Sequence, residues 1–520
     1  DFTTETFNPE WYAHIDDFQN LRFMAWGETN NSDIVSWSDR VTPESFTNGS
    51  HDGVAAEYWV ELANLLSKDI WVCIPHLADE SYVRGLAKLI DDNLNSDLRV
   101  YVEYSNEIWN PQFTQTPFAT NYGLQMWPGE NISHLNYAYA ERAAWVWDLF
   151  MQEFADDARV IKTLAGQAQN SWHLTKRLEA LQSSISPAVN PKGLEADVIA
   201  IAPYLTFNSL AATELWNTGD FNGGEDGHPV VHRVTWNGPW QVSGTSAPEV
   251  SNRQVYIRQD GAIVRSADLS ASTSGRASFF FDWSTSGLEA GDSVEAQIND
   301  GTGWVTIFRA DHTQTNGGMR REFFTPLPAE TRMVTDFKVR FRINGNDSDD
   351  TFIIDGIHLN VLPTVDFLLD ELMVDEVQVS ELDNVRRHVE LADAFGATVV
   401  CYEGGQHLTA LRSSNQDRAL LQILDDAQRD LRMRQRYLEY LTMMNHEGVA
   451  VFSHFSDVGV NGPHGSWGMM ESIYDTRETA PKYDALMTWI ESNPASEATL
   501  PVGSGYGAAE DGVPPPAIEP

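Results

Sequence analysis

The chain has few cysteines, few basic residues and no long hydrophobic run, and each shortage excludes a class of protein. Its two cysteines, Cys73 and Cys401, cannot build a disulfide framework, and both lie in apolar strand-like runs, where a free Cys is usually a small buried hydrophobe. Lys and Arg total 34 against 75 Asp and Glu, a net charge of −41, which disfavours nucleic acid and anionic membranes as partners. The longest apolar runs fall far short of the ~20 residues that a membrane-spanning helix needs.

The remaining composition is that of a folded protein with large cores. Of 520 residues, 42% are hydrophobic and 11% aromatic, so we expect two or more domains and not a disordered chain. The acidic excess is typical of proteins from salty surroundings or from outside the cell. The chain opens with Asp1–Thr4 and shows no basic and apolar leader, as in a processed protein. We therefore expect a secreted or cell-surface protein.

Residues 1–228 alternate short apolar runs with longer amphipathic stretches. Near-continuous apolar strands separated by helices indicate a parallel sheet covered by helices. The expected helices include Pro9–Phe18, Val54–Leu66, Glu80–Asn93 and Ala138–Phe154, and the expected strands are Leu21–Trp26, Ile70–Pro75, Arg99–Tyr104, Val160–Ala165 and Val198–Tyr204. We take this stretch as the first segment of an α/β domain.

Residues 229–363 follow a different pattern, in which apolar and polar residues alternate. Runs such as Ser293–Ile298 and Phe337–Arg342 are separated by turn clusters such as Asp300–Gly303. This pattern predicts an all-β sandwich of jelly-roll type. The β-α alternation returns in residues 364–498, with a long helix expected over Ala419–Met444, so the sandwich is predicted to be an insertion within one α/β domain. Residues 499–520 are rich in Gly, Ala and Pro and predict an exposed linker or tail.

Counting strands leaves the α/β domain one short. Thr398–Tyr402 and Val449–His454 bring the total to seven, whereas a closed (β/α)8 TIM barrel has eight. We predict such a barrel with its first strand lacking in this chain, because residues 9–18 already resemble a helix with no strand before it. A strand within Phe2–Phe7, or a sheet that does not close, is the alternative.

Two of the predicted strands end near a carboxylate. Glu107 comes shortly after Arg99–Tyr104, and Glu403 directly follows Thr398–Tyr402. A buried strand has no structural need for a charge at its end, because burying an unpaired carboxylate costs several kcal/mol. A pair of carboxylates is the minimal equipment for cleaving a glycosidic bond. The two strand ends therefore predict a catalytic pair.

The same segments carry a family resemblance. Ser105–Asn110, with the sequence SNEIWN, resembles the acid/base signature of the retaining glycoside hydrolases of clan A, and Tyr402–Gly404 resembles their nucleophile strand. These cellulase-like (β/α)8 enzymes carry the acid/base at the end of the fourth strand and the nucleophile at the end of the seventh. Once a first strand is added, Glu107 and Glu403 fall on those strands. The resemblance covers the two α/β segments and excludes the sandwich and the tail.

This resemblance implies a double displacement by two glutamates. Glu107 would be the acid/base, with a raised pKa, and Glu403 the nucleophile, with a lower pKa because hydrogen bonds hold it ionised. A retaining pair lies about 5–5.5 Å apart, and a separation beyond ~6.5 Å would indicate an inverting enzyme. Either glutamate could instead be a structural ion-pair partner. Glu103, on the same strand as Glu107, is expected to be a second-layer residue in the interior.

Other residues at the same strand ends are candidates for substrate binding. In the family, an early arginine and a sixth-strand aromatic residue hydrogen-bond the nucleophile, which gives these roles to Arg22 and Tyr204, and Asn106 would bind the sugar hydroxyl beside the scissile bond. Aromatic rings would stack on sugar rings, although core packing is the equal alternative for any one of them. The remaining candidates are His76, Trp26, Trp109, Trp172, Trp467 and His454, the last at a position where many relatives have tryptophan.

No metal-ligand spacing, phosphate loop or nucleotide fingerprint is present, so no cofactor is expected. The acidic turns Asp300–Gly301 and Asp347–Asp350 would suit a structural calcium ion in the sandwich, although solvated turns are the commoner explanation.

The favoured function is a secreted, endo-acting, retaining glycoside hydrolase that cleaves β-linked plant or algal polysaccharide. The alternative is a non-catalytic carbohydrate-binding or structural surface protein built on a glycosidase-like barrel. Polysaccharide or oligosaccharide is the expected partner, with no nucleic acid and no membrane insertion. The sandwich would extend the cleft, bind polysaccharide or act as a spacer. A sulfated substrate would need a cluster of basic residues, for which Arg22, Arg40 and His76 are candidates.

Overall fold

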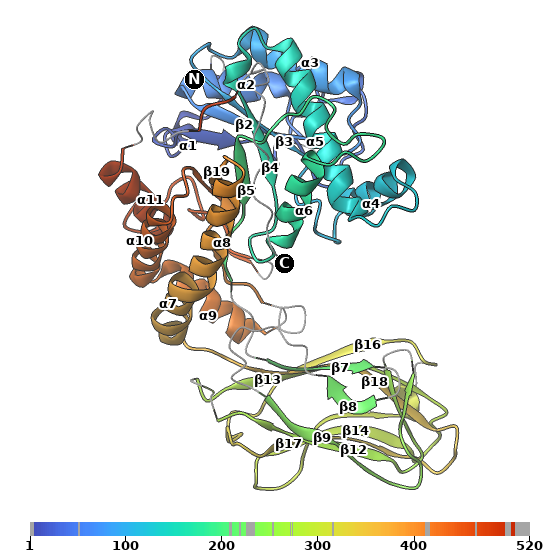
Figure 1. Ribbon diagram of the computed structural model, residues 1–520. Helices are drawn as coiled ribbons and strands as arrows, with labels where there is room; N and C mark the ends of the chain where they lie inside the picture. Colours follow the sequence, from blue (N-terminus) through green and yellow to red (C-terminus); the bar gives the residue numbers. More distant parts are fainter. Residues whose placement is uncertain are drawn as a thin grey trace.

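The computed structural model describes most of the chain (Figure 1). The described residues are 5–49, 53–206, 211–217, 220–224, 235–251, 254–270, 272, 274–314, 317–410, 417–462, 465–494 and 501–504. Within them, an α/β part with a parallel sheet and helices lies at one end, and a part made of antiparallel strands lies at the other.

The α/β part is centred on a seven-stranded parallel sheet. The seven strands expected from the sequence are all present, and neighbours in the sheet pair in parallel. In sheet order they are β1 (Asn20–Arg22), β2 (Asp69–Ile74), β3 (Val100–Tyr104), β4 (Val160–Ala165), β5 (Val198–Ile201), β19 (Thr398–Gly404) and β21 (Phe452–His454). A two-stranded parallel pair, β6 (Leu205–Thr206) with β20 (Gln406–His407), extends beyond β5 and β19.

Helices follow most of these strands and cover the sheet. They are α1 (Pro9–Tyr12), η1 (Trp37–Asp39), α2 (Ala56–Leu66), α3 (Glu80–Asn93), α4 (Gln115–Met126), α5 (His134–Glu153), η2 (Asp157–Arg159), α6 (Trp172–Leu181), η4 (Phe367–Leu372), α7 (Met373–Asp375), η5 (Glu376–Ser380), α8 (Glu381–Ala394), α9 (Arg418–Arg429), α10 (Leu431–His446) and α11 (Pro481–Ser492).

Two helix predictions need correction. The helix expected over residues 9–18 spans four residues, Pro9–Tyr12. The single helix expected over Ala419–Met444 is two helices, because the chain is extended at Asp430, where ψ is 134°. The Asp430 carboxylate accepts a hydrogen bond from the backbone N–H of Arg432 and so begins α10.

Alternating side chains divide the parallel sheet between two cores. In β2, Ile70, Val72 and Ile74 lie in the core shared with the helices, whereas Trp71 and Cys73 lie in a second cluster with residues of β3, β4, β5 and β19. Successive residues of a strand point to opposite faces. One face of the sheet therefore packs on helices. On the other face, side chains from different strands of the sheet pack against one another.

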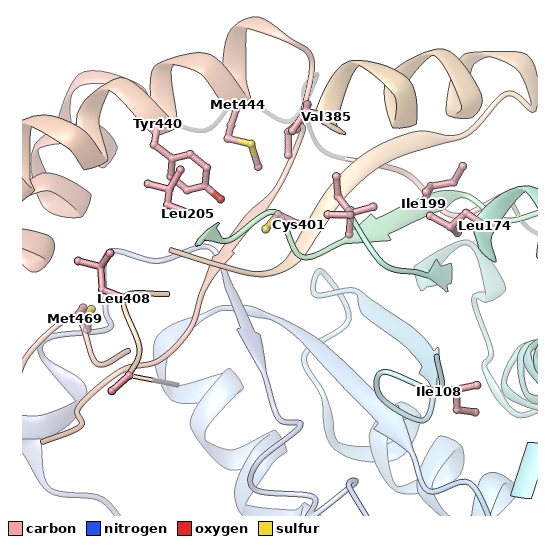
Figure 2. Close-up of a cluster of buried hydrophobic side chains, with 14 of the residues drawn as sticks. Ile108, Leu174, Ile199, Leu205, Val385, Cys401, Leu408, Tyr440, Met444 and Met469 are labelled. Atoms are coloured by element: carbon pink, nitrogen blue, oxygen red, sulfur yellow. The ribbon is translucent and has the colours of Figure 1, made fainter. Parts of the chain in front are cut away.

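Figure 2 shows the helix-facing core beside β5 and β19. Ile199 and Cys401 come from the two neighbouring strands, and Val385 of α8 lies near them with Tyr440 and Met444 of α10. All five are buried. Because each Å² of buried apolar surface contributes roughly 25 cal/mol, these helices hold β19 in place and thereby fix the strand end that follows.

Contacts across the inner face show that the sheet is strongly curved. The guanidinium of Arg22 lies 5.6 Å from the ring centre of Trp71 in β2 and 4.8 Å from that of Tyr402 in β19. Three strands separate β2 from β19 in the sheet order, so a flat sheet would hold them about 19 Å apart at about 4.8 Å per strand. The sheet therefore curls around a shared interior.

The two end strands of the sheet, β1 and β21, do not pair with each other in the described residues. Within the described residues, β1 pairs with β2 alone and β21 with β19 alone. A cavity of about 1260 Å³ is lined by Gln19–Trp26 from one edge and Gly448–Asp457 from the other. The alternative strand within Phe2–Phe7 is not found here: residues 5–7 form no strand, and residues 2–4 lie outside the described residues.

Two antiparallel sheets form the inserted part. One has the order β10-β11-β18-β13-β16, with β7 and β8 joined to it through β18, and the other has the order β15-β14-β17-β12-β9. The strands are β7 (Ala211–Asn217), β8 (Asp220–Gly224), β9 (Thr235–Ser243), β10 (Glu249–Ser251), β11 (Gln254–Arg258), β12 (Ala262–Asp268), β13 (Ala277–Ser286), β14 (Ser293–Asn299), β15 (Val305–Asp311), β16 (Arg321–Pro326), β17 (Phe337–Asn344) and β18 (Thr351–Val361), with η3 (His312–Gln314) after β15.

Aromatic side chains join the two sheets into a sandwich. Phe279 and Phe281 of β13 lie 5.9 and 5.0 Å, between ring centres, from Phe341 of β17 in the opposite sheet. All three rings are fully buried. The sandwich therefore has a core of its own, as the alternating sequence pattern predicts.

The start of the sandwich is earlier than predicted. β7 pairs with β18, with Ala211 opposite Asn360 and Glu214 opposite Ile357. The expected boundary at residue 228 places β7 and β8 in the first α/β segment, which is wrong because they belong to a sandwich sheet. The predicted first residue, 229, lies outside the described residues.

The stretch predicted to be an exposed tail begins with an anchored segment. Lys162 donates to the carbonyl of Ser504 at 2.6 Å, and the Ser504 hydroxyl donates to Asp197 at 2.6 Å. Arg99 donates to the carbonyl of Pro501. Residues 501–504 are thus fixed at the start of β3–β5, contrary to the prediction, and residues 499, 500 and 505–520 lie outside the described residues.

Candidate functional site at the carboxyl ends of the parallel strands

The candidate site is built around Arg22, the last residue of β1. Its guanidinium donates to Glu403 Oε1 at 2.8 Å, to Glu103 Oε2 at 2.9 Å and to Asn106 Oδ1 at 2.9 Å. The Arg22 side chain is 6% exposed, so it is not a surface arginine. Because one rigid guanidinium binds groups from β19 and from the end of β3, Arg22 fixes their relative positions.

Both oxygens of Glu403 accept hydrogen bonds. Oε1 binds Arg22, and Oε2 accepts the hydroxyl of Tyr204 at 2.9 Å. Burial raises the pKa of Glu403, while Arg22 and Tyr204 act to lower it. The predicted hydrogen bonds to Glu403 are present. The predicted low pKa is wrong, because burial outweighs them and the pKa of Glu403 is raised. Burial and then the charge of Glu403 raise the pKa of Tyr204 well above its usual value, so the hydroxyl remains a donor.

Glu107 lies just beyond β3 in a backbone conformation that few residues adopt. The φ angle is +58° at Ser105 and +41° at Glu107, in the left-handed region where non-glycine residues are uncommon and cluster at functional sites. The Asn110 amide donates to Glu107 Oε2 at 3.0 Å. Burial raises the pKa of Glu107 to about 7, and the charge of Glu403 adds to the rise. Glu107 therefore keeps its proton at a higher pH than an ordinary glutamate.

A set of amides behind these groups was not recognised from the sequence. Asn106 donates to Asn30 Oδ1 at 3.1 Å, and Gln115 donates to the same oxygen at 2.7 Å and to the Asn106 carbonyl at 2.9 Å. Gln115 is fully buried at the start of α4. The network orients the Asn106 side chain toward Arg22. The only sequence signal was the polar pair Asn30-Asn31 in a loop after β1, which carries no information about its partners.

Glu103 occupies the second layer that the sequence predicts, and its binding partners come from β2. Its Oε2 accepts Trp71 Nε1 at 2.9 Å and Cys73 Sγ at 3.4 Å, besides Arg22. Glu103 is fully buried. The alternation of β2 places residues 71 and 73 on one face, but only the register of β2 against β3 brings Cys73 opposite Glu103.

Close packing surrounds the end of β19. A Cβ on Gly404 would lie 2.6 Å from the ring of Phe452, and one on Gly405, whose φ is +135°, would lie 2.9 Å from the Tyr437 hydroxyl. His454 Nε2 lies 3.2 Å from the same hydroxyl, and burial lowers the pKa of His454 to about 3. His454 thus stays neutral, supports the strand end through Tyr437 and lines the cavity beside β21.

Aromatic rings continue from Tyr204 along one side of the site. Its ring centre lies 5.5 Å from that of His407, which in turn lies 5.7 Å from that of Trp467. Trp467 Nε1 donates to His407 Nδ1 at 3.1 Å, so the proton of the neutral imidazole is on Nε2. The sequence suggested no role for His407, because the contact depends on a loop sixty residues further along the chain.

Trp26 and Trp109 lie close to the carboxylates. Trp26 stacks on Trp11 at 5.9 Å between ring centres and lines the same cavity as Glu403. Trp109 follows Glu107 by two residues, and its indole N–H is buried with no hydrogen-bond partner among the described residues.

His76 and Trp172 have contacts of other kinds. His76 packs edge-on against Phe118 at 5.1 Å, and burial lowers its pKa. Trp172 begins α6, is 48% exposed and lies against His173. In the described part of the chain, the carboxyl groups of Glu107 and Glu403 accept hydrogen bonds from Asn110, Arg22 and Tyr204, and not from His76 or Trp172.

The turn carboxylates of the sandwich bind backbone groups. Asp300 accepts the N–H groups of Thr302 and Arg332, and Asp350 accepts those of Asn346 and Asp347. In residues that the structure describes, no three His, Cys, Asp or Glu side chains gather as metal ligands. A search of the same residues finds no helix of the length and apolarity that spanning a bilayer requires.

Comparisons with known proteins give limited similarity. No protein-family model matches the chain, and no curated protein matches it. Among solved structures, a family 61 carbohydrate-binding module bound to β-1,4-galactotriose is 16% identical, with 23% of this chain and 87% of that chain covered and a TM-score of 0.19. A family 29 module bound to mannohexaose is 10% identical, with 30% and 92% covered and a TM-score of 0.20. A xylan-binding domain from Paenibacillus barcinonensis is 11% identical, with 30% and 96% covered and a TM-score of 0.19.

Proposed function

We propose that this protein is a retaining glycoside hydrolase in which Glu107 and Glu403 cleave a β-linked polysaccharide. One observation carries the proposal: a buried glutamate, Glu403, and a partly buried one, Glu107, influence each other's charge and have different surroundings. Among the described residues, Glu403 accepts hydrogen bonds from two side chains, Arg22 and Tyr204, whereas the Glu107 carboxyl accepts one, from the amide of Asn110. Two carboxyl groups with distinct environments are what a nucleophile and a general acid require.

In the first step, protonated Glu107 gives its proton to the glycosidic oxygen as the bond from that oxygen to the anomeric carbon breaks. A carboxylate oxygen of Glu403 attacks the anomeric carbon and forms a glycosyl ester. Arg22 favours the ionised form of Glu403 against the effect of burial, and it orients the carboxylate before the attack. A pKa of about 7 keeps a large fraction of Glu107 protonated below neutral pH.

In the second step, Glu107, now ionised, takes a proton from a water molecule. The resulting oxygen attacks the anomeric carbon, and Glu403 leaves as a carboxylate. Once the Glu403 charge is lost in the ester, the electrostatic cause that raises the pKa of Glu107 is removed. The pKa of Glu107 should then fall, which suits its change from acid to base.

The proposal also covers the fold that carries these residues, the mode of cleavage and the place where the protein acts. The curved sheet would be a (β/α)8 barrel with one strand place open, acting within polysaccharide chains outside the cell. Support comes from the position of Glu107 and Glu403 at the carboxyl ends of parallel strands, where barrel enzymes have their sites. A net charge of −41 supports a polysaccharide partner over nucleic acid.

The test is product formation on a panel of plant and algal glycans. We expect reducing ends from the parent protein, a loss of at least a thousandfold in kcat for Glu403→Gln, and no change for Glu130→Gln, an exposed control. Glu107→Gln should lose activity on polysaccharide but still release the phenol of aryl glycosides in a first-turnover burst, because that leaving group needs no proton, whereas the second step is slowed. Activity in Glu403→Gln equal to that of the control would overturn the assignment of the nucleophile.

The same glycan panel distinguishes two other functions, an inverting hydrolase and a non-catalytic binding protein. An inverting enzyme would give products of inverted anomeric configuration, which NMR detects before mutarotation. A non-catalytic carbohydrate-binding protein would bind glycans from the panel and release no reducing ends from any of them.

A further inference from the structure

The basic cluster considered from the sequence does not form. Arg22 is bound to two carboxylates, and Arg40 pairs with Glu57 at 2.8 Å and stacks on Trp37 at 4.1 Å. Both arginines thus form ion pairs within the protein. A ligand with negative charges would have to be recognised elsewhere on a chain in which acidic residues outnumber basic residues by more than two to one.

The outer face of one sandwich sheet gathers basic residues. In β17, Phe337, Val339, Phe341 and Ile343 are buried, and the alternate residues point outward. The outward residues include Lys338, Arg340 and Arg342, and Arg309 of β15 is exposed beside them. We refer to these four residues with Trp304 as the basic face. Figure 1 places the sheet of β9, β12, β14 and β17 as the sandwich layer farther from the parallel sheet.

The basic face has fewer carboxylates than cations. Glu295 is shared by Arg309 at 3.4 Å and Arg342 at 3.5 Å. Lys338 pairs with the exposed Asp336 at 3.0 Å. Arg340 makes no ion pair with a carboxylate in the described part of the chain and donates instead to Gln297 Oε1 at 2.7 Å. Burial and then the charge of Arg342 lower the pKa of Arg340, as expected where positive charges are not fully balanced.

An aromatic ring and neutral polar groups accompany these charges. The Arg340 guanidinium lies 4.0 Å from the ring centre of Trp304, which is 36% exposed. The pairing registers place Gln241, Val264, Arg340, Gln297 and Thr306 side by side across five strands. At about 4.8 Å per strand this row is about 19 Å long, the length of several sugar rings. The exposed Gln241 amide and Thr306 hydroxyl can bind sugar hydroxyls, and the indole can stack on a sugar ring, whereas the buried Gln297 holds Arg340.

We propose that the basic face binds an anionic polysaccharide, one that carries carboxylate or sulfate groups, at a site separate from Glu107 and Glu403. Arg340 and Arg342 pair with the anionic groups, and Trp304 stacks on a ring of the chain. The choice of a polysaccharide rests on the proposed function, and the anionic class rests on the face itself. A long glycan held there would raise the local concentration of substrate at the carboxylate pair.

The test measures binding without turnover, so that it is independent of catalysis. Glu403→Gln full-length protein is run in affinity electrophoresis at 0.1 M salt, where screening confines the repulsion of the remaining acidic surface to about 10 Å. The gels contain polygalacturonate for carboxylate, carrageenan for sulfate, or an unsubstituted β-glucan as the neutral glycan. Arg340→Gln/Arg342→Gln is compared with Arg386→Gln/Arg429→Gln, which removes the same charge from two exposed arginines elsewhere.

We expect retardation by at least one anionic glycan, at least tenfold weaker binding in Arg340→Gln/Arg342→Gln, and unchanged binding in the charge-matched control. Trp304→Ala should weaken binding in the same gels, and urea unfolding checks that each variant is folded. The gel that retards the protein distinguishes carboxylate from sulfate recognition. The proposal is wrong if no anionic glycan retards the protein, if the neutral glycan binds equally, or if both double variants lose binding alike. Binding on the basic face together with no activity of the parent protein on any glycan would count against the proposed function alone.

Discussion

At the scale of single residues, the site depends on how one cation is shared by three groups. Arg22 binds Glu103, Glu403 and Asn106 in a pocket with little solvent. Two buried carboxylates around one guanidinium leave negative charge in excess, and this excess, with burial, sets the protonation of the neighbouring Glu107. The chemistry of the site is therefore a property of the group and not of any one glutamate.

Replacing Arg22 tests this dependence. Arg22→Met leaves Glu103 and Glu403 buried without their cation, so we expect a loss of 3–5 kcal/mol in the free energy of unfolding, the usual cost of breaking a buried pair. Arg40→Met, which removes a partly exposed partner of Glu57, should cost about 0–1 kcal/mol. Urea unfolding measures both. Equal losses would show that Arg22 is not central to the packing of the carboxylates.

The pH dependence of the rate tests the protonation of Glu107. A general acid must be protonated to act, so kcat/KM should fall as pH rises through about 7, where Glu107 loses its proton. On the acid side the rate should fall as Glu403 becomes protonated. The profile is measured on polysaccharide from pH 4 to 10. With an aryl glycoside, Glu107→Gln should lack the alkaline decrease, and a decrease that persists in this variant would assign it to another group.

At the scale of elements, the strand end at Gly404-Gly405 positions Glu403, the proposed nucleophile. Gly405→Ala forces a Cβ to 2.9 Å from Tyr437 and 3.2 Å from His454, and it puts alanine at a φ of +135°. Gly396→Ala, at a φ of +69° with open space around it, is the matched control for backbone strain. We expect about 1 kcal/mol of destabilisation in the control and 1–3 kcal/mol more at Gly405.

Activity separates these variants further. Gly405→Ala should lower kcat at least tenfold, because a displaced strand end moves Glu403 relative to Glu107. Gly396→Ala should keep kcat. If both variants retain full activity, the glycine at 405 serves only the fold.

The elements also show what could be read from the sequence. Strands buried on both faces appear as continuous apolar runs, so all seven parallel strands were predicted within a few residues. The break at Asp430 was missed because the helical period continues on both sides, and β7 was missed because its pairing partner, β18, lies some 140 residues further on. Glu107 and Glu403 could be proposed from the sequence because charge at a strand end is unusual. Trp71 and Gln115 were not, because their roles depend on strand register and on a loop contact.

At the scale of the whole molecule, the net charge of −41 sets the response to salt. Like charges repel across the surface of the folded protein, and salt screens this repulsion. We expect Tm to rise as NaCl increases from 0.02 to 0.5 M, measured by calorimetry at pH 8. KCl should give the same increase, because screening does not depend on the cation. A Tm that falls with both salts would mean that attractive ion pairs outweigh the repulsion.

The insertion of the sandwich between β5 and β19 has a consequence for the order of folding. Val198 and Thr398 are neighbours in the sheet, and pairing them directly would close a loop of about 200 residues, at an entropic cost that grows with loop length. β7 and β18, near the two ends of the insertion, pair with each other. If the sandwich folds first, it brings those ends together and shortens the loop from about 200 to about 50 residues. The carboxylate pair would then be among the last contacts to form, and a core defect in the sandwich could slow its assembly without touching the site.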